Sequence, residues 1–190
     1  MSKLSSWPLS PDSSRYVIPH SLLEQLSQHV LTQDLYPLGL GYYAAALGHA
    51  MTREFHDDHL LIYCVKGRGL LKVGPRRGYL KAGQLVLLPR GLAHNYASDA
   101  ADPWTIYWVH FDGKTALDFF NNLPLDRGFP VLNVGYNAKL IADFETLLQV
   151  RQSGYQLKHV FHAANQLRQI LSYLALLHYS DKSASGFDLE

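Results

Sequence analysis

Cysteine is almost absent from this 190-residue sequence, and neither sign of charge prevails. The single cysteine, Cys64, excludes an intrachain disulfide, and its place in an apolar run indicates a small buried hydrophobic side chain. Lys and Arg total 17, and Asp and Glu total 16. A chain so close to neutral is not expected to bind nucleic acid by itself, because phosphate binding needs clustered cations.

Long apolar runs and catalytic motifs are missing as well. No apolar run approaches the roughly 20 residues that a transmembrane helix needs, and the segment from Met1 to Pro11 has no apolar core of a signal peptide. The sequence contains no Gly-x-Ser-x-Gly, no phosphate-binding loop and no credible Cys–His pair. We therefore expect a cytoplasmic protein that is not an enzyme, has no cofactor and does not contact a membrane.

What the chain does contain, in its first two thirds, is a series of short strands. The apolar runs stop at turns rich in Gly, Pro and Arg, at residues 66–69, 74–78 and 89–91. Several short strands with such punctuation at close spacing favour an all-β barrel or sandwich. The predicted strands are Leu38–Ala46, His59–Val65, Leu70–Val73, Leu85–Leu88 and Trp104–Phe111.

After Gly135 the apolar period changes to that of helices. A first helix is expected around Leu140 and Phe144, a break at Ser153-Gly154, and a longer helix from Gln156 to Tyr179. The longer helix is apolar on two sides, which predicts packing on the first helix and on a second copy of the chain. The alternative is that both sides are buried within one chain. The residues predicted to form the dimer are Leu167, Ile170, Leu171, Leu174 and Leu177.

These patterns divide the chain into four parts. Residues 1–14 form an N-terminal arm, 15–135 the barrel and 136–180 a helical hairpin. Residues 181–190 have the polar, small-residue composition of a linker. We expect this linker to lead to a further domain that the sequence does not include, and Leu189-Glu190 to be a remnant of cloning.

The stretch from Gly83 to His94 has the spacing Gly, five residues, Pro, one, Gly, two, His. Gly83 permits a tight turn into a buried strand, and His94 begins the next strand pointing into the barrel. This spacing resembles the second conserved motif of the cupin superfamily. The resemblance implies a cupin-like barrel, that is, a jelly roll or double-stranded β-helix, followed here by the helical hairpin.

In metal-binding cupins, this His joins a His-x-His pair and a Glu from the first motif. Counting back from Gly67 places Leu60 at the Glu position, and no His-x-His precedes it. His56 and His59 are three residues apart, so on a strand they point to opposite faces. Because a metal needs three or four converging donors, we predict no metal site.

Strand alternation predicts a pocket with both aromatic and polar walls. Tyr96 faces inward with His94, while Trp108 and Ile106 share one face of the last strand. With Arg53 and His49 these residues suit a sugar, because aromatic faces stack on C–H groups and polar side chains bind hydroxyls. The alternative is that Arg53 pairs with a surface Asp and the aromatic rings simply pack together.

An ordered set of segments resembles the regulatory domain of the AraC family of transcription regulators. The likeness covers most of residues 10–180, including the two terminal helices. Its segments are Gly41-Tyr42-Tyr43, His49, Arg53, Leu61–Gly69, Lys81-Ala82-Gly83, Pro89-Arg90-Gly91, His94-Asn95-Tyr96, Pro103-Trp104 and Tyr107–Phe111.

The resemblance implies an effector-binding barrel and dimerisation through the C-terminal helices. In the arabinose-binding member, sugar contacts fall at positions that match Arg53, Tyr96 and Trp108. Ile106 stands where that member has a polar residue, so we expect an effector other than arabinose. An arm that closes over the ligand is known in the family, and Trp7 with Pro8 would take that part. Promoter DNA would be bound only by a helix-turn-helix domain absent from this sequence.

Two other functions remain open at this stage. One is a metal-dependent cupin enzyme that acts on a sugar. The other is a dimerisation module whose barrel is filled by its own side chains.

Overall fold

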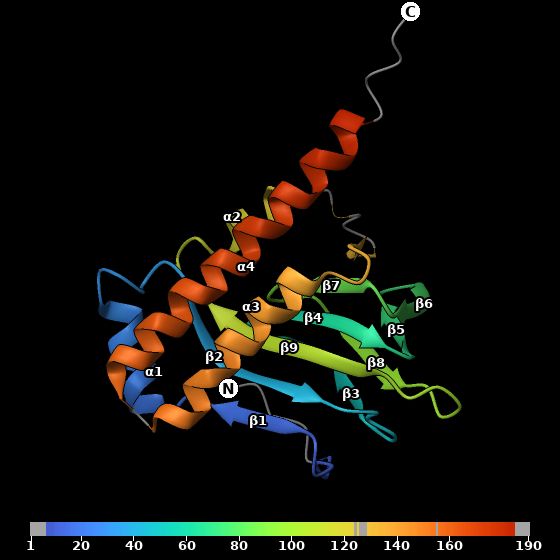
Figure 1. The fold of residues 1–190 in the computed structure, drawn as a ribbon, viewed down its shortest axis with the longest axis horizontal. Helices are drawn as coiled ribbons and strands as arrows, with labels where there is room; N and C mark the ends of the chain where they lie inside the picture. Colours follow the sequence, from blue (N-terminus) through green and yellow to red (C-terminus); the bar gives the residue numbers. More distant parts are fainter. Residues whose placement is uncertain (1–6, 124, 126–128, 155, 185–190) are drawn as a thin grey trace, which may run out of the picture.

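The computed structural model describes residues 7–123, 125, 129–154 and 156–184, which form a β-barrel flanked by helices (Figure 1). The elements in chain order are β1 (Ser14–Val17), α1 (His20–Gln28), β2 (Tyr36–Tyr43), β3 (Ala50–Arg53), β4 (His59–Lys66), β5 (Arg68–Val73), β6 (Arg76–Lys81), β7 (Gln84–Leu88), β8 (His94–Ser98), β9 (Thr105–Asp112), α2 (Ala116–Asn121), β10 (Val131–Asn133), α3 (Ala138–Leu148), a 3-10 helix (Gln149–Ser153) and α4 (Leu157–Ala184). The predicted fold class, a mainly β cupin-like barrel followed by helices, is confirmed.

Two antiparallel sheets face each other to make the barrel. The larger sheet has the strand order β1-β2-β9-β4-β7-β10, and the smaller has the order β3-β8-β5-β6. Between β6 and β7 the chain turns at Gly83, whose φ is +82°. A Cβ at this position would lie 3.1 Å from the backbone of Gly135. Glycine is required here both by the left-handed backbone and by the close approach of the second segment.

The larger sheet is buried on both faces, which explains the unbroken apolar run of β4. Leu60, Ile62 and Cys64 belong to the core inside the barrel. Leu61 and Tyr63 point the other way, into the core beneath the helices. A strand covered on both sides has no polar face to present, so its sequence shows no alternation.

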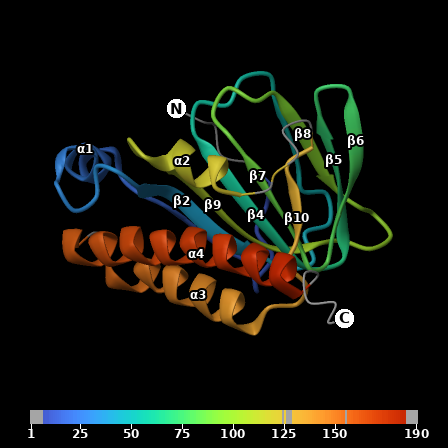
Figure 2. The same ribbon diagram turned by 90° about the horizontal axis from the view of Figure 1, so that it is seen from above.

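Helices α3 and α4 lie side by side along the outer face of the larger sheet (Figure 2). The break between them falls at the 3-10 helix and at Gly154, whose φ is +61°, in agreement with the predicted break. Neither α1 nor α2 was predicted from the sequence. None of the described helices has the length and apolar character that crossing a membrane requires.

The α4 residues predicted to form the dimer are largely buried within a single chain. Four of the five residues are no more than 1% exposed within a single chain, and Leu177 is half-buried. One side of α4 packs against α3 and the other against β2, so the chain itself covers both apolar stripes. The residues covered are Leu167, Ile170, Leu171 and Leu174.

The end of the last helix overlaps the segment predicted as a linker. Helix α4 continues through Ala184, four residues into the segment 181–190. The physical reason is that Asp, Lys, Ser and Ala are all tolerated in a helix, and the first glycine is Gly186. The remaining residues of the predicted linker, 185–190, lie outside the described part of the chain, as do the first six residues of the arm.

Candidate functional site

The two sheets enclose a small cavity at the centre of the barrel, with a volume of about 20 Å³. Five of the residues predicted to bind a ligand line it together: His49, Arg53, Tyr96, Ile106 and Trp108. The other lining residues are Tyr43, Met51, Leu60, Ile62 and His110. The structure therefore brings together residues that are up to 67 positions apart, from Tyr43 to His110, around one point.

Strand pairing places the polar walls of this cavity. Strands β3 and β8 are antiparallel, with Met51 opposite Tyr96 and Arg53 opposite His94. On β9, Trp108 faces inward because the strand alternates. Its large ring fits because β2 has Gly41 directly opposite, where a Cβ would lie only 2.6 Å from the indole.

Several buried ring nitrogens in the barrel have no hydrogen-bond partner among the described residues. Four of them are Nδ1 of His49, Nε2 of His94, and the Nε1 atoms of Trp104 and Trp108. A buried polar atom without a partner costs about 1–3 kcal/mol, and most proteins avoid it. Four such atoms in one barrel indicate an interior suited to polar groups that come from outside the chain.

Burial in the barrel keeps the side chains of His49 and Tyr96 neutral. Burial, reinforced by the charge of Arg15, lowers the pKa of His49 from 6.5 to about 4. Burial likewise raises the pKa of Tyr96 far above its ordinary value. At neutral pH these side chains therefore offer hydrogen bonds without charge, and the guanidinium of half-buried Arg53 is the cation that lines the cavity.

Trp7 of the N-terminal arm packs against the same residues. Its ring centroid lies 5.2 Å from that of Tyr43 and 5.5 Å from that of His49. Its Nε1 donates a 2.9 Å hydrogen bond to the carbonyl of Leu47. Pro8, by contrast, is exposed and does not line the cavity.

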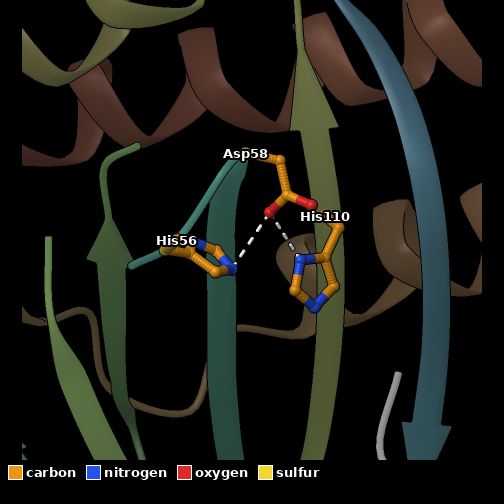
Figure 3. A group of neighbouring side chains, drawn as sticks. All are labelled: His56, Asp58 and His110. Carbon is orange, nitrogen blue, oxygen red and sulfur yellow. Dashed lines mark hydrogen bonds and ion pairs between the residues drawn. The ribbon is translucent and has the colours of Figure 1, made fainter. Parts of the chain in front are cut away.

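A second polar group lies beside the cavity, where β4 begins and β9 ends. The carboxylate of Asp58 sits between two imidazoles (Figure 3), with Oδ1 at 3.0 Å from Nε2 of His56 and 2.8 Å from Nδ1 of His110. All three residues are buried. The ring of His94 lies 4.8 Å from that of His56, so His94 borders this cluster rather than the cavity.

A groove of about 580 Å³ reaches the cluster from outside the barrel. It runs between α1 and β2, and Asp58 and His110 line it. Because His110 lines the barrel cavity too, the cluster stands between the groove and the barrel interior.

This cluster was not predicted from the sequence, because the cupin metal motif requires a His-x-His pair ahead of Leu60 and the chain has none there. Asp58 lies outside the positions of that motif. The inward direction of His110 could be predicted from the sequence, because His110 lies two residues after Trp108 on the same strand. That these two segments meet follows only from the pairing of β4 with β9.

A jelly-roll barrel with a buried aromatic and polar interior defines a cupin-like ligand-binding domain. The model of the AraC-like ligand binding domain matches residues 37–179, and the chain belongs to this family. The family predicted from the sequence is thereby confirmed.

Curated relatives of the chain carry the names of operon regulators. The chain is 45% identical over 181 residues to the MmsAB operon regulatory protein of Pseudomonas aeruginosa, which covers 93% of this chain and 59% of that protein. It is 26% identical over 102 residues to the Msm operon regulatory protein of Streptococcus mutans, covering 54% of this chain and 36% of that protein. It is 34% identical over 56 residues to the lactose operon transcription activator of Staphylococcus xylosus, covering 30% and 20%. The chain thus spans less than two thirds of each of these proteins.

Proposed function

We propose that this chain is the effector-sensing domain of a transcription regulator, and that its barrel binds a small polar molecule rich in hydroxyl groups, such as a sugar. The observation that carries the proposal is the set of buried ring nitrogens without partners. Sugar hydroxyls both donate and accept hydrogen bonds, so they suit the indole N–H of Trp108, the imidazole of His49 and the guanidinium of Arg53. The faces of Trp108 and Tyr96 would pack on the apolar C–H side of such a ligand.

The size of the cavity indicates that the described arrangement is closed. A volume of about 20 Å³ holds roughly one water molecule, whereas pockets for small ligands measure roughly 300–1,000 Å³. The effector must therefore open the barrel, and Trp7 is the side chain placed over its polar wall. We infer that effector binding displaces Trp7 and so changes the position of the arm. The regulator would then have two states, one with Trp7 packed on the barrel and one with Trp7 displaced.

The proposal also concerns DNA and a second copy of the chain as partners. DNA would be bound by another part of a longer protein in the cytoplasm, because the relatives are operon regulators and this chain spans 59% of the first of them. The chain would act as a homodimer. Since its own fold covers the inner stripes of α4, the interface would involve the outer side of that helix, where Leu176 is 63% exposed. We infer a regulatory rather than a catalytic role.

The test is a binding screen on the 190-residue chain with pentoses, hexoses, disaccharides and hydroxy acids. Thermal unfolding detects a hit, because a ligand at 100 times its Kd stabilises the folded state by about 2.7 kcal/mol. Calorimetry then measures the affinity of Arg53→Met and Trp108→Phe, which remove single polar groups. Arg77→Met on exposed β6 is the matched control for the arginine.

We expect Arg53→Met and Trp108→Phe each to weaken binding at least about tenfold, the equivalent of one lost hydrogen bond to a buried group. Arg77→Met should bind like the wild type. A hit whose affinity is unchanged by both barrel variants would place the effector elsewhere, and the groove beside α1 would be the next site to examine. A complete screen without a hit would favour a barrel filled by its own side chains.

A further inference from the structure

We propose that His56, Asp58 and His110 bind a divalent transition-metal ion, with the ring of His94 beside them. This inference does not require the proposed effector, although the cluster shares His110 with the cavity. No metal site was predicted from the sequence, and the structure supplies a donor set that the cupin spacing did not indicate: His56 and Asp58 from the segment before β4, and His110 from β9.

The geometry of the three donors suits a small ion. One nitrogen from each imidazole and one oxygen of the carboxylate lie within 4.8 Å of one another. In a tetrahedral site with bonds of about 2.0–2.1 Å, donor atoms lie about 3.3 Å apart. Small side-chain rotations would bring all three atoms around a common centre.

The chemistry of the donors selects the class of metal. Imidazole nitrogens favour Zn²⁺, Fe²⁺, Ni²⁺ or Cu²⁺, whereas Ca²⁺ and Mg²⁺ prefer sites built from oxygen atoms alone. Two imidazoles and one carboxylate converge here, and all three residues are at most 7% exposed. Burial on this scale favours coordination, because water competes little for the ion or the ligands.

His94 supplies a second observation, since its Nε2 is one of the buried ring nitrogens described above. Its Nδ1 lies 2.8 Å from the carbonyl oxygen of Leu92, and a carbonyl only accepts, so Nδ1 carries the proton. In the neutral ring, Nε2 then has a free lone pair, and this atom is buried without a partner in the described structure. A metal-binding histidine is typically held in this way, with its other nitrogen donating to a backbone carbonyl.

A plain hydrogen-bonded His–Asp–His network is the competing explanation. It accounts for the contacts of Asp58, but it leaves Nε2 of His94, beside His56, buried and without a partner among the described residues. The groove between α1 and β2 also gives the cluster a path of entry from solvent, which a metal site requires and a hydrogen-bonded network does not.

The experiment uses the 190-residue chain freed of metal with a chelator. Calorimetric titration with Zn²⁺ measures stoichiometry and affinity, and titration with Co²⁺ gives a visible spectrum that reports the ligands. The variants are Asp58→Asn and His110→Gln. Two controls are His59→Gln, a buried histidine on the opposite face of β4 that stacks on Phe111, and His20→Gln, an exposed one.

We expect one ion per chain for the wild type and both controls, with a Co²⁺ spectrum free of thiolate charge transfer. Asp58→Asn and His110→Gln should bind at least about tenfold more weakly. The proposal is overturned if the wild type binds neither ion, or if both variants bind as it does. Circular dichroism shows whether each variant folds.

A measurement on the wild type decides the matter even where a variant does not fold. Anomalous scattering from crystals grown with Zn²⁺ locates the ion directly. An ion about 2.0–2.2 Å from donor atoms of Asp58 and His110 supports the site. An ion bound only elsewhere, for instance on exposed histidines, or no ion at all, refutes it.

Discussion

Replacement of Gly41 by alanine tests how the barrel accommodates Trp108. A Cβ at Gly41 would lie 2.5 Å from the carbonyl oxygen of Ser14 and 2.6 Å from two atoms of the Trp108 ring. Both distances are far inside van der Waals contact, so either β1 or the indole must move. Such overpacking costs about 1–3 kcal/mol in a well-packed core.

Gly39 provides a matched control on the same strand. A Cβ there would meet its nearest atom, the carbonyl oxygen of Tyr16, at 3.4 Å and the Trp108 ring at 3.9 Å. Where a side chain fits, Gly→Ala stabilises by about 0.4–1 kcal/mol, because alanine restricts the unfolded chain. Gly39→Ala should therefore be neutral or slightly stabilising.

Urea unfolding followed by tryptophan fluorescence and circular dichroism measures both variants. We expect the free energy of unfolding of Gly41→Ala to fall at least about 1 kcal/mol below that of Gly39→Ala, and its Tm to fall by about 2–4 °C per kcal/mol. Equal stability of the two variants would show that Trp108 does not lie against β2 as described.

Three further predictions follow from the same contacts. Between pH 6.5 and 4, the unfolded chain gains a proton at His49 that the folded chain excludes, so stability falls as the pH is lowered. The difference between pKa values of about 4 and 6.5 corresponds to about 3 kcal/mol of unfolding free energy. In urea unfolding measured at a series of pH values, His49→Phe should reduce the loss of stability over this range. An unaltered dependence on pH would contradict this. Trp7→Ala should lower stability by about 1 kcal/mol through lost ring contacts, whereas the same change at exposed Leu9 should have no effect; equal effects would place the arm elsewhere. Leu171→Ala should destabilise the chain by about 2–5 kcal/mol, because Leu171 lies in the hydrophobic core. Leu176→Glu should leave the stability unchanged and yield monomers in light scattering. An unchanged mass would show that the interface does not involve this side of α4.

The two C-terminal helices show what sequence periodicity can predict and what it cannot. Periodicity correctly predicted two helices, their break at Gly154 and the two apolar sides of the second. It did not reveal what covers each side. A stripe of leucines that faces β2 of its own chain is indistinguishable, in sequence, from one that faces a second subunit. Residues such as Ile170 were therefore assigned to a dimer although they lie in the core.

More of the barrel could be predicted from local sequence patterns. The glycine and proline spacing from Gly83 to His94 predicted the cupin-like turn, and alternation predicted that Tyr96 and Trp108 point inward. Both features depend only on backbone geometry within a few residues, so one sequence suffices to predict them. The short helix α1 was missed, and with it the groove that it forms with β2.

The sequence alone thus determined the fold class and the inward direction of residues such as Tyr96 and Trp108, because these depend on short-range periodicity and spacing, and its resemblance to known regulators indicated the family. Only the tertiary structure decided that the barrel centre is nearly closed, that the arm's Trp7 covers its polar wall, and that Asp58 lies between His56 and His110. Those arrangements arise from the pairing of segments about 50 residues apart. No local sequence pattern predicts these contacts. Alternation along a strand shows to which face a side chain points, but not which residue of another strand lies next to it.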